Sequence, residues 1–339
     1  MNEPNNKRAF EILCALCASD GRGEALFGED IKQLPERIGP FLDTAAFPSI
    51  HLEFPLLGEP YTDVTVLYRT IDEGMRIRSE AVGDTGPLFD WYADICSKYP
   101  RVCFGFELDS ALDHMKAAFG FQPREANELV MPFCDITGTA KQGERYLRAA
   151  EKMPKAWPLS YFGVYPGRDN APFRVCGYYD RKIASSHDIL PDKIKADFEK
   201  IGFEAYDLPM LEQISKILSL GVNAIDFQFD IYPDESFSDV FALDVQLKEM
   251  SSIKVREDFE NGVSAEVVSI LKSWGIADGR TSMLKDLSLS RGIKVMSEND
   301  GIVDYALICK PEWIKFRWKD RKLQPSKCYC LLYAGRLQC

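Results

Sequence analysis

Polar and apolar residues alternate in most short segments after residue 48, and this period of two is typical of strands with one apolar face. Turn residues such as Gly58 and Pro60 separate neighbouring segments, which indicates antiparallel pairs. The segments that we expect to pair are 49–55 with 63–70, 101–108 with 128–137, 158–165 with 173–179, 224–231 with 240–247, and 313–319 with 327–333.

Helical spacing of apolar residues replaces this alternation between the pairs. The first 45 residues have apolar positions three and four apart, which predicts two or three helices. Further helices are expected at 87–98, 141–152, 191–201, 210–220 and within about 255–289. We therefore divide the chain into an N-terminal helical segment, residues 1–48, that packs on a single domain, residues 49–339.

A strand–strand–helix unit thus recurs along the chain, beginning near residues 49, 101, 159, 223 and 313. An antiparallel sheet of this size tends to curl, and closure removes its exposed edges. The predicted fold class is α/β (α+β): a ten-stranded antiparallel barrel of repeated strand-pair and helix units with the helices outside. An open sheet, or two smaller domains, remain alternatives at this point.

Charge and composition narrow the possible partners. The formal net charge of -11 opposes broad association with nucleic acid or with an anionic membrane. No apolar run approaches the roughly 18–20 residues that span a bilayer, and the polar N-terminus lacks the apolar core of a secretory signal. We therefore expect a cytoplasmic protein.

Cysteine and histidine spacings offer little support for a metal site. Ten cysteines are dispersed along the chain, which favours reduced thiols. Cys14-x-x-Cys17 resembles half of a metal or redox motif, but no second CxxC follows, and we interpret it as helix packing. Cys328 and Cys330 lie near Lys327, which leaves a cysteine-dependent enzyme as one hypothesis, although both fall on the apolar face of their segment.

The alternation sorts strand residues onto two faces. Facing the helices we place Ile50, Leu52, Phe54, Val64, Val66, Tyr68, Phe173, Val175, Ile225, Phe227, Phe229, Phe241, Leu243, Val245, Ile314, Phe316 and Trp318. The opposite face receives His51, Glu53, Arg69, Arg101, Glu107, Arg174, Tyr178, Asp226, Gln228, Asp244, Gln246, Lys315, Arg317, Lys327 and Tyr329. This second face is either an ordinary wet side of an antiparallel sheet or the wall of a solvent-containing chamber.

The chamber interpretation carries specific chemistry. Cations and phenols recur two residues apart on their strands, as in Lys315-x-Arg317 and Lys327-x-Tyr329, so they point to the same side. Several fixed cations with hydroxyl donors suit a ligand of dense negative charge such as a diphosphate. Nearby aromatic rings would shield a carbocation, and Glu53 is the candidate base.

These residues resemble the aromatic prenyltransferases of the ABBA type over roughly residues 49–335. Arg174-Val-Cys-Gly-Tyr178 is similar to the family pattern R-x-K-x-Y with Cys176 in place of lysine, and Lys327-Cys-Tyr329 is similar to K-x-Y. Glu53, in His51-Leu-Glu53, stands where the indole-modifying branch has its proton acceptor. The resemblance implies a barrel with a central reaction chamber.

The implied activity is transfer of an allylic group, from dimethylallyl or geranyl diphosphate, to an electron-rich aromatic acceptor in secondary metabolism. The acceptor would be an indole, a phenol or a peptide side chain, with no required cofactor, optional help from Mg²⁺, and a monomer or dimer as the working form. The expected diphosphate ligands are Arg69, Arg174, Tyr178, Lys315, Arg317, Lys327 and Tyr329; the expected polar contacts of the lumen are His51, Glu107, Asp226, Gln228 and Gln246. The alternative is a non-catalytic barrel that binds a small molecule or peptide, since the chain has no Walker A, GxGxxG, GxSxG or HExxH motif.

Overall fold

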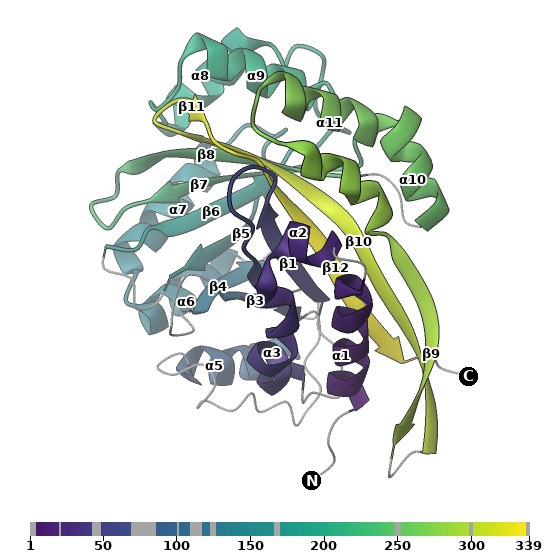
Figure 1. The fold of residues 1–339 in the computed structure, drawn as a ribbon. Coiled ribbons are helices and arrows are strands. Elements are labelled where there is room, and N and C mark those ends of the chain that lie inside the picture. Colours follow the sequence, from purple (N-terminus) through teal and green to yellow (C-terminus); the bar gives the residue numbers. More distant parts are fainter. Residues whose placement is uncertain are drawn as a thin grey trace.

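The strands form one antiparallel barrel in a computed structural model (Figure 1). The structure describes residues 5–19, 22–42, 49–68, 86–99, 102–108, 117–122, 127–165, 170–247, 252–297 and 301–336. The barrel strands are β1 (Ser49–Pro55), β2 (Asp63–Tyr68), β3 (Cys103–Leu108), β4 (Ala117–Gln122), β5 (Leu159–Val164), β6 (Phe173–Tyr178), β7 (Ala224–Ile231), β8 (Phe237–Gln246), β10 (Gly301–Lys319) and β12 (Lys327–Arg336).

Two long-range pairings close the barrel. From β1 to β8 each barrel strand pairs with the next, while β12 pairs with β1. The second half of β10 then pairs with both β12 and β8, from Trp313 opposite Gln246 to Lys319 opposite Val240. The predicted ten-stranded antiparallel barrel is therefore confirmed.

Helices cover the outside of the barrel (Figure 1). They are α1 (Asn5–Ala18), α2 (Arg22–Phe27), α3 (Leu34–Leu42), α5 (Gly86–Cys96), α6 (Val130–Thr137), α7 (Ala140–Lys152), α8 (Pro191–Ile201), α9 (Leu208–Leu218), α10 (Ser252–Asn261) and α11 (Val263–Ser273), with the 3-10 turns η1 (Glu29–Lys32), η3 (Asn127–Leu129) and η4 (Gly279–Asp286). No helix in the described ranges is long and apolar enough to cross a bilayer.

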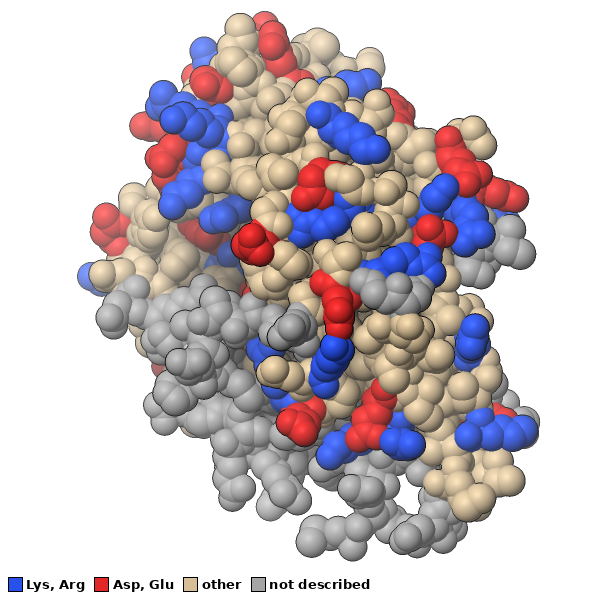
Figure 2. All heavy atoms as spheres, in the orientation of Figure 1, with Lys and Arg blue, Asp and Glu red and all other residues tan. Residues whose placement is uncertain are grey.

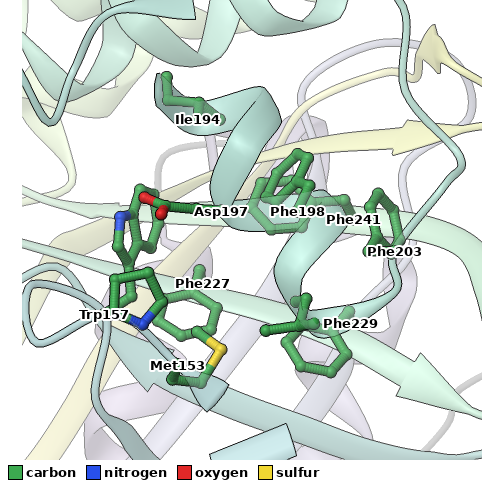
Figure 3. A pocket seen from close by; sticks show the side chains of 11 residues that line it. Met153, Trp157, Ile194, Asp197, Phe198, Phe203, Phe227, Phe229 and Phe241 are labelled. Carbon is green, nitrogen blue, oxygen red and sulfur yellow. The ribbon is translucent and has the colours of Figure 1, made fainter. Parts of the chain in front are cut away.

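The outward strand face forms the core with these helices. Every residue assigned to this face is at most 2% exposed, except Tyr68, whose side chain lies outside the described set. Aromatic rings make the contact in several places: Phe198 of α8 meets Phe241 of β8 with ring centroids 5.0 Å apart (Figure 3). The pocket between α8 and these strands holds about 10 Å³, roughly one water at most. The period-two assignment of this face is thus confirmed.

The fourth predicted strand is wrong. Residues 128–137 form η3 and α6, and the strand that follows β3 is β4, at Ala117–Gln122. The buried residues of the segment are Leu129, Val130, Phe133 and Cys134, which is the spacing of one helix face. Pro132 is tolerated because it lies in the first turn, where a backbone N–H has no intrahelical acceptor.

The last strand pair is longer than predicted. β10 begins at Gly301, where its first half pairs with β9 (Leu289–Ser297), and a short β11 (Lys322–Leu323) pairs with its end. β9 and the first half of β10 extend as a ribbon beyond the barrel (Figure 1). Helix α1 packs against β9, β10 and β12, so this N-terminal helix lies over the ribbon.

Candidate active site inside the barrel

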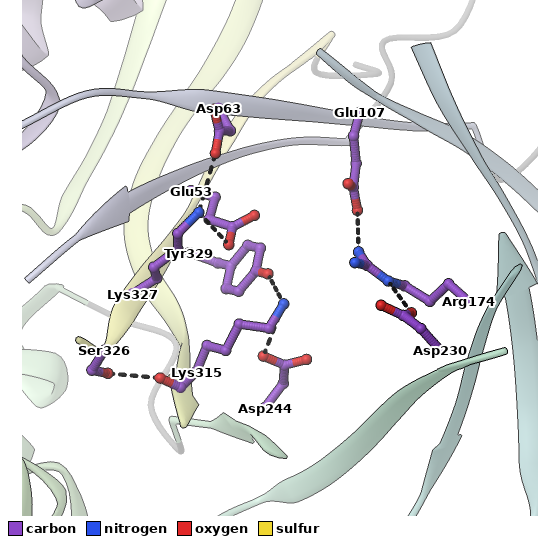
Figure 4. A network of polar contacts seen from close by, with 10 residues as sticks. All are labelled: Glu53, Asp63, Glu107, Arg174, Asp230, Asp244, Lys315, Ser326, Lys327 and Tyr329. Carbon is purple, nitrogen blue, oxygen red and sulfur yellow. Dashed lines mark hydrogen bonds and ion pairs between the residues drawn. The ribbon is translucent and has the colours of Figure 1, made fainter. Parts of the chain in front are cut away.

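Ionised side chains from separate strands line the inside of the barrel (Figure 4). Arg174 of β6, Lys315 of β10 and Lys327 of β12 are the central cations, and each alternates with a buried residue of the outward face. Acidic and basic residues are interspersed on the exterior face in Figure 2, without a continuous field of one sign.

The first cluster joins the first and last barrel strands. The Nζ of Lys327 lies 3.1 Å from Glu53 Oε1 and 3.2 Å from Asp63 Oδ2. Burial alone would raise the pKa of Glu53, but Lys327 and Lys315 outweigh it and lower that pKa to about 2. Burial would lower the pKa of Lys327, yet Glu53 and Asp63 raise it above its usual value. Glu53 and Lys327 are thus held ionised.

The second cluster surrounds Lys315. Its ammonium donates a hydrogen bond of 2.7 Å to the Tyr329 hydroxyl and lies 3.9 Å from Asp244 Oδ1, while Ser326 donates to its backbone carbonyl. Burial raises the pKa of Asp244 to about 6, although Lys315 opposes the shift. Asp244 Oδ1 is buried and accepts no hydrogen bond within the described part of the chain. We therefore expect Asp244 to change charge near pH 6.

The third cluster surrounds Arg174. Its Nε donates a 3.2 Å hydrogen bond to Asp230 Oδ1, its Nη1 lies 3.6 Å from Glu107 Oε1, and its guanidinium stacks 4.7 Å over the Tyr165 ring. Burial would lower the pKa of Arg174, but Tyr165 and the two carboxylates raise it well above its ordinary value. The guanidinium is thus a permanent charge that is already neutralised by acidic neighbours.

The three clusters act on one another across a shared interior. Arg174 contributes to lowering the pKa of Glu53, and it opposes the rise at Asp244. Burial raises the pKa of Tyr329 strongly, with further contributions from Glu53 and Asp244. Side chains from β1, β3, β6, β8, β10 and β12 therefore belong to a single electrostatic unit.

Some of the residues proposed from sequence converge here and others do not. Glu53, Glu107, Arg174, Lys315, Lys327 and Tyr329 all belong to the three clusters. Asp226 and the buried Gln228 lie on the same face of β7. Tyr178 is 37% exposed, and Arg317 forms no ion pair among the described residues.

Two polar residues expected in the lumen have other local partners. His51 Nε2 contacts Glu312 Oε2 at 2.8 Å, and Glu312 also lies 3.4 Å from Lys310 Nζ. Gln246 accepts a hydrogen bond of 2.6 Å from Asn223. Arg69 and Arg101 lie outside the described residues.

Sequence reasoning missed several members of the network. Asp63 stands directly opposite Glu53 in the register, and Asp230 continues the inward row of Asp226 and Gln228. Both could have been found by extending the alternation by one position. Glu312 lies at an irregularity in the β10 register, where alternation fails, so no pattern in the chain marks it.

Cys176 occupies the position where the resemblance expects lysine. It is fully buried, lies opposite Tyr161 in the register and accepts a hydrogen bond from the Tyr161 side chain. The interior therefore lacks a cation at this point. Carboxylates also stand beside Arg174, Lys315 and Lys327, so the described part of the interior is not predominantly basic.

The described residues include no preformed metal-binding site. Among those residues, no group of three or more His, Cys, Asp or Glu side chains is placed to hold a metal ion. The chemistry available from the chain itself is thus fixed charge, hydrogen bonding from Tyr329, and proton transfer at a carboxylate.

Known structures share this architecture although sequences do not. No protein-family model and no curated protein sequence matches the chain. 5-Dimethylallyltryptophan synthase from Streptomyces coelicolor is 12% identical, with 97% of this chain and 95% of that chain covered and a TM-score of 0.52. The prenyltransferase PriB, in a ternary complex with L-tryptophan and dimethylallyl thiolodiphosphate, is 12% identical at the same coverage with a TM-score of 0.55.

A third match extends the likeness to another organism. AnaPT from Neosartorya fischeri is 10% identical, with 96% of this chain and 91% of that chain covered and a TM-score of 0.50. Identities this low show the fold alone. The chain has the ABBA barrel fold of aromatic prenyltransferases, as the resemblance of its strand motifs predicted.

Proposed function

We propose that this chain is an aromatic prenyltransferase, which moves an allylic group from its diphosphate to an electron-rich aromatic ring. The observation that carries the proposal is the convergence of Arg174, Lys315 and Lys327 inside a barrel of this fold. PriB, which has the same fold, was crystallised with an allylic diphosphate analogue and an aromatic amino acid.

Diphosphate binding would use the three cations and the Tyr329 hydroxyl. A diphosphate oxygen can replace a carboxylate oxygen beside Lys327 or Arg174, because both donors prefer bidentate or charge-assisted contacts. The carboxylates that it displaces then face the acceptor side of the site. On binding, these cations would therefore exchange carboxylate oxygens for diphosphate oxygens.

The transfer step breaks the bond between the allylic carbon and the diphosphate oxygen, and the diphosphate leaves with the electron pair. The aromatic carbon then attacks the allylic cation, and Glu53 accepts the proton that the acceptor loses. Aromatic faces already hold cations here, since Arg174 lies over Tyr165 and Lys315 lies 5.2 Å from the Tyr329 ring centroid. The same faces would stabilise the allylic cation.

A thermal-shift titration tests the donor site. Dimethylallyl and geranyl diphosphate should raise the Tm of the wild type, and Arg174→Ala and Lys327→Ala should lose most of that increase. Lys216→Ala is the matched control, since Lys216 pairs with Glu266 on the exterior and its side chain is 52% exposed. Absence of a response to either diphosphate, or full responses in both chamber variants, would contradict the proposal.

Turnover is tested separately. The purified protein is incubated with one of the two diphosphates and with one acceptor, either L-tryptophan, a phenol or a tryptophan-containing dipeptide. Each reaction is run with Mg²⁺ and with EDTA, and products are followed by mass spectrometry. Glu53→Gln should retain the thermal response to diphosphate but lose most of the product. A variant with normal turnover would remove Glu53 from its role as base.

The pairing of the three central cations also favours a second candidate. Arg174, Lys315 and Lys327 each have a carboxylate partner, and such an interior suits a ligand with little net charge, as a non-catalytic binding protein would hold. In that case aromatic amino acids or peptides raise the Tm, diphosphates do not, and no transfer product forms.

A further inference from the structure

Thiols from three separate elements meet beneath α1, outside the chamber. Cys17 is on α1, Cys309 is on β10 and Cys330 is on β12. The Sγ atoms of Cys309 and Cys330 are 3.4 Å apart, and the Cys17 thiol hydrogen-bonds to Cys309. Cys14, one helical turn before Cys17, is close enough to affect the pKa of Cys309. The CxxC segment of the helix therefore has partners that its sequence neighbourhood does not contain.

Cys17 is the member of this cluster that solvent reaches. It is 8% exposed, whereas Cys14 is 3% exposed and Cys309 and Cys330 are fully buried. Cys17 lines a pocket of about 180 Å³ between α1, η4 and the start of β9. Cys17 is thus the residue of the cluster that borders this pocket, whereas Cys309 is fully buried.

The lining of the pocket has more positive than negative charge, since it includes Arg22, Arg291 and one acidic residue, Asp286. Arg22 lies 3.5 Å from Asp286, which Arg256 also contacts, whereas Arg291 forms no ion pair within the described ranges. Arginine side chains that line the same pocket attract anionic reagents. A reagent that carries carboxylates is therefore favoured over a neutral one.

We propose that Cys17 is a redox-active thiol that exchanges with small disulfides bearing carboxylates, and that Cys309 resolves the product. The Cys17 thiolate attacks one sulfur of the small disulfide, which releases one small thiolate and leaves a mixed disulfide on Cys17. Cys309 then loses its proton and attacks Cys17 Sγ, which releases the second small thiol and forms the Cys17–Cys309 disulfide. The protein loses two hydrogens, and one small disulfide becomes two thiols.

The second step should be the slower one. Cys17 acts to lower the pKa of Cys309, but the contact with Cys330 and burial raise that pKa well above its usual value. Little Cys309 thiolate is present at neutral pH, so the mixed disulfide on Cys17 should form first and decay later. The final bond would join α1 to β10 and stabilise the folded chain by constraining the unfolded one.

The test treats the reduced protein with oxidised glutathione, which carries carboxylates, and follows intact mass and non-reduced peptide maps. The wild type should first gain one glutathionyl group on Cys17, then lose it and finish as the Cys17–Cys309 disulfide with a raised Tm. Cys309→Ser should trap the mixed disulfide. Cys134 is a buried thiol on α6, outside the cluster; Cys134→Ser is therefore the matched control and should follow the wild-type course.

Charge selectivity is tested with hydroxyethyl disulfide, which has no carboxylates. Oxidised glutathione should modify Cys17 several-fold faster than this neutral disulfide. Arg291→Ala should remove this difference in rate, and the comparison does not depend on whether a cysteine variant folds. Modification that begins at another cysteine, equal rates with both reagents, or no trapped adduct in a folded Cys309→Ser protein would each overturn the proposal.

Discussion

Replacing Asp244 by asparagine should stabilise the protein at alkaline pH. Asp244 Oδ1 is buried without a hydrogen bond in the described chain, and its nearest cation, Lys315, lies 3.9 Å away. Ionisation in this position is disfavoured because burial raises the pKa of the carboxyl group from 3.8 to about 6. An asparagine side chain in this place would have nearly the same shape and would never ionise.

The magnitude follows from the size of that shift. One pKa unit corresponds to about 1.4 kcal/mol, so a shift of roughly two units costs about 3 kcal/mol when the group is ionised. Since the folded pKa is the higher one, the folded state binds more protons than the unfolded state between about pH 4 and 6. The stabilising contribution is present below about pH 4 and is lost as pH rises through 6.

Urea unfolding of wild type and Asp244→Asn at pH 4.5, 6 and 8 measures the effect. The difference in unfolding free energy should change in favour of the variant by about 2–3 kcal/mol between pH 4.5 and 8. Asp234→Asn is a suitable control, since Asp234 is exposed and its pKa is lowered, chiefly by hydrogen bonds from Ser236. A difference between variant and wild type that does not vary with pH would refute the reasoning about Asp244.

Three other expectations concern stability. Glu53 has a folded pKa of about 2 against an ordinary 4.5, so its ionised form should contribute about 3 kcal/mol to the free energy of unfolding above pH 4.5. This contribution is lost as pH falls towards 2. In urea titrations, the stability of Glu53→Gln should therefore depend less steeply on acid pH. Gly177→Ala should lower the unfolding free energy by about 1–3 kcal/mol or more, because the added Cβ would lie 2.4 Å from Phe227 and from the Pro158 carbonyl. In the control Gly279→Ala the added Cβ meets nothing within 4 Å, so the urea midpoint should change little. Trp318→Phe should lower the unfolding free energy by about 1–3 kcal/mol, because Gln213 loses the 2.8 Å hydrogen bond from the indole, and Gln213→Leu in the same background should recover part of the loss.

Alternation identified most barrel strands because one face is buried and the other is polar. Residues 313–319 show this clearly, with Ile314, Phe316 and Trp318 outward and Lys315 inward. β4 lacks such a signal, since its sequence AAFGFQ has no charged residue and its glycine lies opposite Gly105 and Gly163. A strand that packs small residues against small residues has no polar face to reveal it.

The sequence predicted which residues face the site more readily than which of these side chains contact one another. Facing side chains follow from period two, but the contact of Glu107 with Arg174 joins β3 to β6, which are not neighbours in the sheet. That contact depends on barrel diameter and strand stagger, which are properties of the closed sheet. Likewise Lys315 and Lys327 are directly opposite each other, yet their ammonium groups turn to different carboxylates.

The way in which the barrel closes sets an order of events during synthesis. β1 pairs with β12, and β8 pairs with the second half of β10, so both free edges of the sheet stay open until these last two barrel strands leave the ribosome. Those edges are templates for wrong pairing in the meantime, and contacts between distant parts of the chain form slowly. β10 and β12 therefore complete the barrel last, and a chain that stalls before them exposes an aggregation-prone open sheet to chaperones.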